Sequence, residues 1–251
     1  LSIVVANLDE APTFVSSNNV IMPENYAVSY QVQAVDPDSP TTGLSYAITG
    51  GADASLFTID SITGHLIFLA TPDFEAPGDA GSNNVYNVTV SVTDGNSFVY
   101  QSIMFQIYNA NETPSITSAP AFAANENALV VGTITASDPD GTTPSFAIVG
   151  GADAARFVID TASGQLSFIA APDYEVPGDA DGNNVYEVTV QASDGSLTSV
   201  QAVSVTLGNV NEAPVITSQV LFTAAENGIA VGNVAASDVD SATITYAISG
   251  G

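Results

Sequence analysis

A six-residue segment that occurs three times at nearly equal spacing constrains the fold most strongly. It reads Asn-Leu-Asp-Glu-Ala-Pro at residues 7–12, Asn-Ala-Asn-Glu-Thr-Pro at 109–114 and Asn-Val-Asn-Glu-Ala-Pro at 209–214. The copies begin 102 and 100 residues apart (109 − 7 and 209 − 109). This spacing is too long for one unit of a solenoid and fits a complete β-sandwich domain. Each copy is therefore interpreted as a linker between tandem domains.

Other motifs follow each linker in the same order. Glu-Asn comes first and an Asp-x-Asp motif second; in the two complete repeats Asp-aromatic-Glu and Ser/Thr-Asp-Gly motifs come next. The spacings differ by two residues because one loop, at 39–43, is shorter in the next repeat, as is usual for loops. We expect residues 1–11 to be the last strand and linker of a preceding repeat in a longer array. Residues 12–113 and 114–213 are predicted as repeats 1 and 2, and 214–251 as the N-terminal part of repeat 3.

Apolar residues alternate with polar ones in short segments, which predicts half-buried β-strands. In residues 85–92 and 185–192 the even positions, from Tyr86 and Tyr186 onward, are predicted to face a core. Residues 1–6 show the same alternation. Turn-forming Gly, Asn and Asp residues separate the segments, and no helical apolar period persists for three turns. The sequence predicts an all-β fold of tandem Ig-like Greek-key β-sandwiches joined end to end.

The charge balance excludes several partners. The chain has 27 Asp and Glu against 1 Lys or Arg, a net charge of −26, so binding to nucleic acid or an anionic lipid surface is not expected. Only 11% of residues are charged and the chain has no cysteine. It therefore has enough apolar residues to form cores, but neither disulfides nor thiolate sites.

The carboxylates recur at fixed places in each repeat. Side chains at i and i+2 share a face of an extended backbone, so Asp-x-Asp and Asp-aromatic-Glu are each predicted to present two carboxylates on one side. Many oxygen ligands without His or Cys suit Ca²⁺ better than Mg²⁺ or Zn²⁺. The alternative is the acidic surface of a salt-adapted protein.

These motifs resemble tandem cadherin repeats, specifically the cadherin-like repeats of large bacterial surface proteins. The resemblance implies Ca²⁺ ions between successive repeats, with ligands from the first repeat, the linker and the second repeat. For the junction of repeats 1 and 2 it implies Glu24, Asp73, Glu75, Asn111, Glu112, Asp138, Asp140 and Asp194. For the next junction it implies Glu126, Asp173, Glu175, Asn211, Glu212, Asp238 and Asp240. At the start of the chain it implies Asp9, Glu10, Asp36, Asp38 and Asp94.

The chain departs from the family pattern in two ways. The family linker reads Asp-x-Asn-Asp-Asn-x-Pro, whereas this linker is one residue shorter before proline and has Glu for the second Asp. The chain has no Trp, so the strand exchange of animal cadherins that docks a Trp is not implied. Tyr and Phe fall mostly at core positions, so no sugar-stacking platform is predicted.

The resemblance implies a non-enzymatic adhesion module, stiffened by Ca²⁺, in an extracellular or cell-surface protein tethered to a membrane through another part of the parent. Its partners would be neighbouring repeats and a cell-surface protein, including a second copy. The alternative is a Ca²⁺-dependent polysaccharide-binding module. Asp79, Asp179 and Asp181 are interpreted as exposed loop residues rather than an additional ion site, and Asn87 and Asn111 lie in glycosylation sequons.

Overall fold

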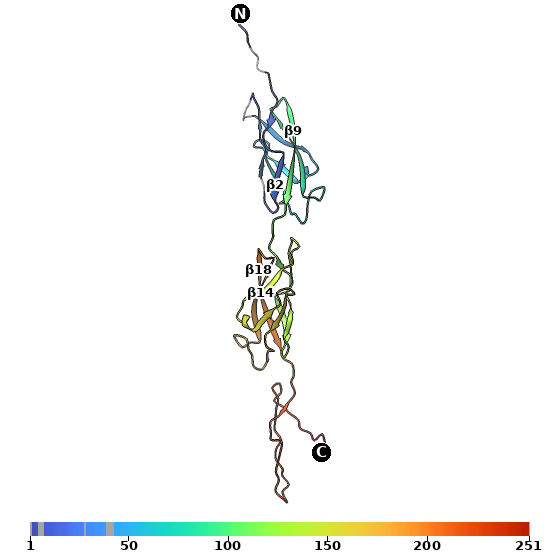
Figure 1. Cartoon of the computed structure of the whole chain (residues 1–251), viewed down its shortest axis with the longest axis vertical. Helices are drawn as coiled ribbons and strands as arrows, with labels where there is room; N and C mark the ends of the chain where they lie inside the picture. The colour runs from blue at the N-terminus through green and yellow to red at the C-terminus, as the bar shows by residue number, and fades with distance from the viewer. Residues whose placement is uncertain (1, 5–7, 28, 39–42, 251) are drawn as a thin grey trace. The chain divides into compact units, whose positions relative to one another are not determined.

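The computed structural model describes residues 2–4, 8–27, 29–38 and 43–250. The chain divides into two compact units, Leu1–Asn111 and Glu112–Gly251, and the division falls inside the linker at 109–114. Figure 1 shows each unit as a β-structure, with β2 and β9 labelled in the first and β14 and β18 in the second. Among the described residues, no helix is long and apolar enough to cross a membrane.

The first unit contains a four-stranded sheet, a three-stranded sheet and a two-stranded pair. The four-stranded sheet has the order β2-β9-β8-β5; β2 runs parallel to β9, and the other pairs are antiparallel. The three-stranded sheet has the order β3-β7-β6, and β1 pairs with β4. The bounds are β1 Thr13–Phe14, β2 Asn19–Pro23, β3 Ser29–Gln31, β4 Ala34–Val35, β5 Ser45–Gly50, β6 Phe57–Ile59, β7 His65–Phe68, β8 Val85–Thr93 and β9 Phe98–Tyr108.

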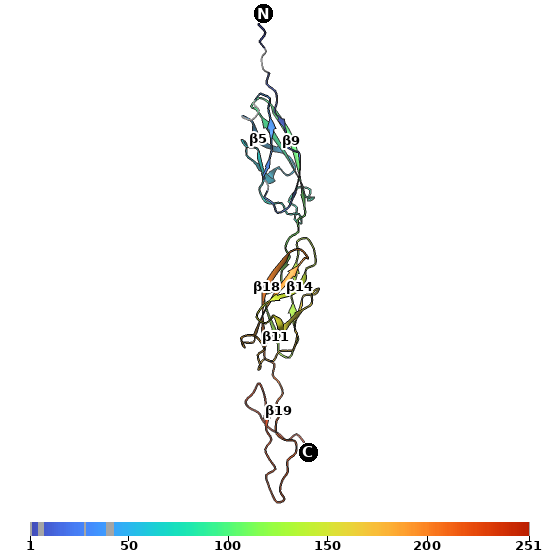
Figure 2. The same ribbon diagram turned by 60° about the vertical axis from the view of Figure 1, so that its left-hand side comes forward.

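The second unit repeats this topology and adds one further two-stranded pair, β19-β20. Its sheets are β11-β18-β17-β14 and β12-β16-β15, with the pairs β10-β13 and β19-β20; Figure 2 labels β11, β14 and β18 of the four-stranded sheet. Each unit also has one short 3-10 turn, η1 Ala54–Leu56 and η2 Ala154–Arg156. The bounds are β10 Ser115–Ile116, β11 Ala121–Asn125, β12 Val130–Thr133, β13 Ala136–Ser137, β14 Ser145–Gly150, β15 Phe157–Ile159, β16 Gln165–Phe168, β17 Val185–Ser193, β18 Thr198–Gly208, β19 Val215–Ile216 and β20 Ala236–Ser237.

The core of each repeat lies between its two sheets. The even positions of β8 and β17 are buried, as the alternation predicts, and the odd positions of β9 and β18 pack beside them. In the first repeat the rings of Phe57 and Phe68 lie 4.3 Å apart, and the ring of Phe68 meets Tyr86 edge-on at 5.3 Å. Burial of these aromatic side chains contributes to the hydrophobic stabilisation of the first repeat.

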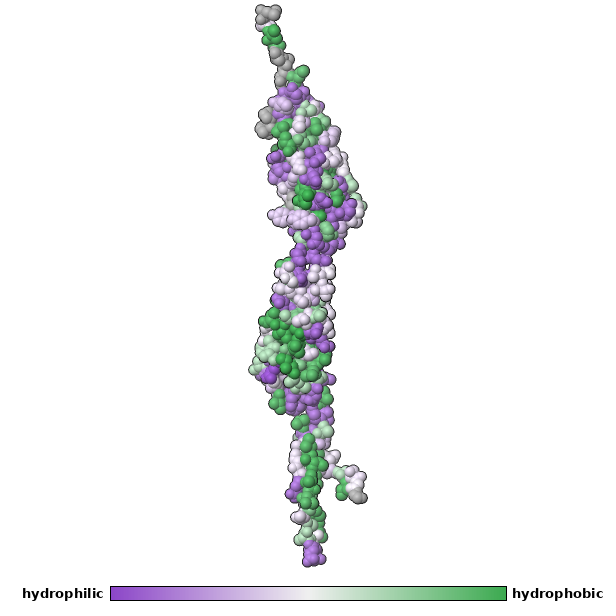
Figure 3. Space-filling view, viewed as in Figure 1, coloured by the Kyte–Doolittle hydropathy of each residue, from purple (hydrophilic) through white to green (hydrophobic). Residues whose placement is uncertain are grey.

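The chain ends differ from the complete repeats. Residues 2–4 form no strand, and the remainder of the strand predicted at 1–6 lies outside the described residues. A sandwich strand requires neighbouring strands for its hydrogen bonds, and none is present for this segment among the described residues. In residues 214–250 the apolar side chains of Val220, Leu221, Ile229 and Ile248 are exposed, and Figure 3 shows apolar surface along this segment.

A buried aspartate, which the sequence analysis did not single out, fixes a loop to the sheet in each repeat. In the second repeat Asp153 is 5% exposed. Its Oδ1 accepts the Ala180 N–H at 2.7 Å, and its Oδ2 accepts the Glu187 N–H at 2.8 Å. Asp53 makes the equivalent bonds to Ala80 and Asn87. The recurrence of Gly-Gly-Ala-Asp in both repeats was the available sequence signal.

We expect Asp153→Ala to destabilise the second repeat by about 3 kcal/mol, because two charge-assisted hydrogen bonds are lost and two amides are left unsatisfied. Asp160→Ala is the control, since that carboxylate caps an exposed turn through Ala162 and Ser163. Urea unfolding without divalent ions measures both variants. Equal losses in the two variants would contradict the role assigned to Asp153.

Candidate calcium-binding site

Glu126 connects three segments at one end of the second repeat. It directly follows β11, and its N–H donates to the Gly208 carbonyl at 3.0 Å at the end of β18. Its side chain is 3% exposed. One carboxylate oxygen accepts the Tyr174 N–H at 2.8 Å and the other accepts the Val210 N–H at 2.7 Å. Glu126 therefore fixes the Asp-Tyr-Glu loop and the linker together.

Two further glutamates meet at this end of the repeat. Glu175, from the Asp-Tyr-Glu loop, accepts a hydrogen bond from the Asn209 side chain at 2.5 Å. Glu212, from the linker, accepts one from the Asn127 side chain at 2.7 Å. Asn127 has a left-handed backbone, with φ of 63°, which asparagine tolerates better than most residues. It was not among the predicted site residues, although Asn follows Glu in all three repeats.

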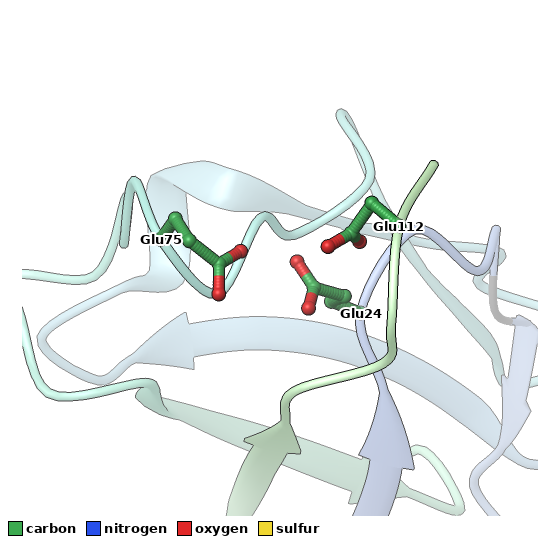
Figure 4. A group of neighbouring side chains, drawn as sticks. All are labelled: Glu24, Glu75 and Glu112. Atoms are coloured by element: carbon green, nitrogen blue, oxygen red, sulfur yellow. The ribbon is translucent and has the colours of Figure 1, made fainter. Parts of the chain in front are cut away.

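One oxygen from each of Glu126, Glu175 and Glu212 lies within 4.8 Å of the other two. The same separation holds for Glu24, Glu75 and Glu112. Figure 4 shows the carboxylates of this set turned toward one another, with Glu112 on the linker segment. Glu24 is bonded as Glu126 is, accepting the N–H groups of Phe74 and Ala110.

Asp238 and Asp240 lie on a turn rather than on an extended strand. The Asp240 N–H donates to Asp238 Oδ1 at 3.0 Å, and the Glu212 N–H donates to Asp240 Oδ2 at 2.6 Å. The extended geometry predicted for Asp-x-Asp is therefore wrong. An aspartate side chain readily accepts the N–H two residues further along, which forms a turn. Asp138 and Asp140 form the same turn, and the Glu112 N–H donates to Asp140 Oδ2 at 2.8 Å.

Burial and neighbouring groups shift the pKa values of three carboxylates at this end of the repeat. Desolvation raises the pKa of Glu175, and the charges of Glu126, Asp240 and Asp173 raise it further. Desolvation also raises the pKa of Glu212, with Asp240 adding to the effect and the Asn127 amide opposing it. The Glu212 N–H lowers the pKa of Asp240. Crowded carboxylates of this kind repel one another unless a proton or a cation lies between them.

Several buried carboxylate oxygens of the predicted ligands indicate a cation site. Among the described residues, no hydrogen-bond partner is present for Glu212 Oε2, Asp240 Oδ1, Asp138 Oδ2 or Asp140 Oδ1. Buried polar atoms are normally paired, and unpaired ones require an explanation. Carboxylate oxygens with no donor are the ligands that Ca²⁺ prefers. The residues present therefore fit a Ca²⁺ site.

The remaining predicted ligands lie as follows. Asp173 is exposed and accepts the Val176 N–H, as Asp73 does from Ala76. Asp194 accepts the N–H groups of Ser196 and Leu197. Asn211 and Asn111 are exposed, and the Asn211 side chain donates to the Glu212 carbonyl.

The five acidic residues predicted for the start of the chain are also brought together within the first unit. The Glu10 N–H donates to Asp38 Oδ2 at 2.7 Å, and Asp36 accepts the Asp38 N–H at 2.8 Å. Asn96 donates to Asp9 at 3.1 Å. Contact with Asp38 raises the pKa of Glu10. The N–H groups of residues 97 and 96 lower the pKa of Asp94, and the charge of Asp38 opposes this lowering. This group reproduces the turn seen at Asp138 and Asp238.

Asp79 and Asp179 are not exposed loop residues as predicted, because both are buried. Asp79 accepts the N–H groups of Gly81, Asn83 and Asn84. Asp179 accepts those of Asn183 and Asn184. Each is an organiser of its own loop, with its oxygens turned toward the backbone.

Comparison with known protein families identifies the two complete repeats. The cadherin domain family matches residues 18–107 and 120–208, more than half of the 251 residues. The chain therefore belongs to the cadherin domain family and carries tandem cadherin-like repeats. Cadherin domains are typically Ca²⁺-dependent adhesion modules of extracellular proteins, structural in role rather than enzymatic.

Individual relatives match parts of much longer proteins. The chain is 47% identical over 72 residues to Halomucin of Haloquadratum walsbyi, covering 28% of this chain and 1% of that protein. It is 28% identical over 207 residues to human Protocadherin Fat 1, covering 76% of this chain and 4% of that protein. The structure of human Protocadherin-24 EC1-2 (Form II) is 20% identical, with a TM-score of 0.50 over 80% of this chain and 100% of that one. The last match shows the fold alone.

Proposed function

We propose that this chain binds Ca²⁺ at the linkers between its repeats and serves as a stiffened segment of an extracellular or cell-surface adhesion protein. The observation that carries the proposal is the convergence of Glu126, Glu175 and Glu212 with oxygens that lack donors. Asp138, Asp140, Asp238 and Asp240 are proposed to complete the ligand sets with the other predicted residues. The relatives named above lend no support to a polysaccharide partner.

The chain's own residues suit a linker whose stiffness depends on the ion. Glu126 holds the linker through the Val210 N–H, and Asn127 holds Glu212 so that its second oxygen stays available. Glu is one methylene longer than the Asp of the family linker, which lets it reach back to Asn127 across a shorter linker. Without a cation, the like charges repel, and the linker segment is expected to bend more freely.

Ca²⁺ is expected to raise the midpoint of thermal unfolding, while Mg²⁺ and NaCl at matched ionic strength raise it much less. Each site that binds only the folded chain adds about 2.7 kcal/mol of stability when Ca²⁺ is at 100 times the dissociation constant. Extracellular Ca²⁺ modules bind at about 10⁻⁴ to 10⁻³ M, so the titration covers that range. Small-angle scattering on the same samples measures the maximum dimension, which is expected to rise.

The variant Glu175→Gln is expected to weaken Ca²⁺ binding at least tenfold by calorimetry, because it removes one charged ligand from the cluster. Glu187→Gln is the control: this exposed acid lies on β17, outside the cluster. If Ca²⁺ stabilises the chain no more than NaCl does, or if both variants bind equally, the acids are salt adaptation and the proposal fails.

A further inference from the structure

The outer face of the four-stranded sheet in the first repeat carries large apolar side chains that its core does not use. Successive residues of a strand point to opposite faces, so residues 98, 100, 104 and 108 of β9 point away from the core formed by Ile103, Phe105 and Ile107. Phe98 and Tyr100 are each 61% exposed and Tyr108 is 50% exposed. Ile21 of β2, paired beside Gln106, is 64% exposed. We call this surface the β9 outer face.

The second repeat shows that the fold does not require these side chains. Its sheet has the same strand order and the same register between the two long strands. Yet the positions of Ile21, Phe98, Tyr100, Met104 and Tyr108 are occupied there by Ala123, Thr198, Val200, Ser204 and Gly208. The cores of the repeats are alike, so the difference is confined to the surface. Exposed apolar side chains gathered on one face of a sheet are typical of an interaction site.

The β9 outer face is also uncharged. No residue of β2, β5, β8 or β9 is Asp, Glu, Lys or Arg, in a chain that carries 27 acids and 1 base. Uncharged side chains occupy the outward positions of the neighbouring strands: Asn87, Thr89 and Thr93 on β8, and Ser45 and Ala47 on β5. In the second repeat the equivalent face includes Glu187 on β17.

We propose that the β9 outer face binds the same face of a second copy of this chain. Two chains of net charge −26 repel wherever acidic surfaces meet, but two uncharged faces make contact without bringing carboxylates together. A surface that pairs with itself through a two-fold axis forms a closed dimer. This inference names a partner surface for the proposed adhesive function, and the association itself does not depend on that function.

The area of the β9 outer face sets the expected affinity of self-association. Four strands at about 4.8 Å spacing and up to 11 residues at about 3.3 Å give a face on the order of 600 Å². Stable complexes bury about 800 Å² on each partner. A single face should therefore associate weakly, with a dissociation constant on the order of 0.1 mM, and parallel arrays would add faces through avidity.

The test is sedimentation equilibrium of the full chain at up to about ten times that dissociation constant, in 1 M NaCl to screen the acids, with Ca²⁺ and with a chelator. The face variant combines Phe98→Thr, Tyr100→Val and Met104→Ser, which places the second repeat's residues in the first. Its association constant is expected to fall at least tenfold. The control combines Ile62→Thr and Leu69→Thr, which removes exposed apolar surface outside β2, β5, β8 and β9 and should change association less than twofold.

Circular dichroism checks that the face variant is folded. The shift of its melting temperature with Ca²⁺ should equal that of the parent chain, which separates this proposal from the calcium proposal. A chain that stays monomeric throughout, or a face variant that associates as the parent does, overturns the proposal. Affinity electrophoresis in neutral polysaccharides tests the competing occupant. If the polysaccharide retards the parent chain, if the face variant is not retarded, and if the parent chain stays monomeric, self-association is also overturned. The face is then assigned to a glycan.

Discussion

Replacement of Glu126 by alanine is expected to destabilise the second repeat by about 3 to 5 kcal/mol in the absence of Ca²⁺ and to remove most of the stabilisation by Ca²⁺. The side chain is 3% exposed and accepts the N–H groups of Tyr174 and Val210. Truncation leaves both amides without an acceptor, and each costs about 1 to 3 kcal/mol. Relief of repulsion from Glu175 and Glu212 offsets part of this loss, but two lost hydrogen bonds to a charged acceptor outweigh it.

The measurement is urea unfolding with and without Ca²⁺, followed by hydrogen exchange that distinguishes the two repeats. Glu226→Ala is the matched control, because Glu226 occupies the same position after the next linker and is exposed. Glu126→Gln separates the two roles. It keeps one carbonyl acceptor but loses the charge, so the chelated protein should lose less stability than with alanine while Ca²⁺ binding still falls. Full Ca²⁺ stabilisation in Glu126→Ala would contradict the assignment.

The fold was readable from the sequence because its signals are local and repeated. Alternation along 85–92 and 185–192 predicted the buried faces of β8 and β17, and this is confirmed by the burial of Tyr86 and Tyr186. Two-residue pairings such as β1 with β4 escaped notice because two residues carry no period. They bring the strands in the described part of the first repeat to nine, against about seven expected for a sandwich of this length.

The site was readable in composition and less so in geometry. The recurring acids included the two glutamate triads that the structure brings together, but bonds from side chain to backbone decide how the carboxylates point. Asp238 turns its own backbone, and Asp179 satisfies its loop rather than facing solvent. Asn127 and Asp153 were missed because neither belongs to a recurring pattern of charged residues. Asn127 is a neutral amide that orients Glu212, and Asp153 is a single acid that accepts two backbone N–H groups. Only recurrence between the repeats marked them.

Gly151→Ala is expected to destabilise the second repeat by more than about 4 kcal/mol. Gly151 follows β14, where the register with β17 shifts between Ile148 and Gly150, and its φ is +105°. A Cβ built there would lie less than 3.0 Å from the backbone of Glu187 and Val188. These atoms belong to the central strand β17, which is fixed on both sides by β14 and β18. The backbone cannot move away without breaking ladder hydrogen bonds, so strain and overpacking add.

Gly195→Ala separates the two contributions, because Gly195 has a φ of +101° but no atom within 4 Å of its built Cβ. It should cost only the conformational strain, about 1 to 3 kcal/mol. Both variants are compared by urea unfolding in chelator, so that the neighbouring Asp194 does not complicate the result. The first repeat, with its own core, should exchange its amides as in the parent chain. If the two alanines cost the same, close contact with β17 contributes nothing and backbone conformation alone explains why glycine stands at this position.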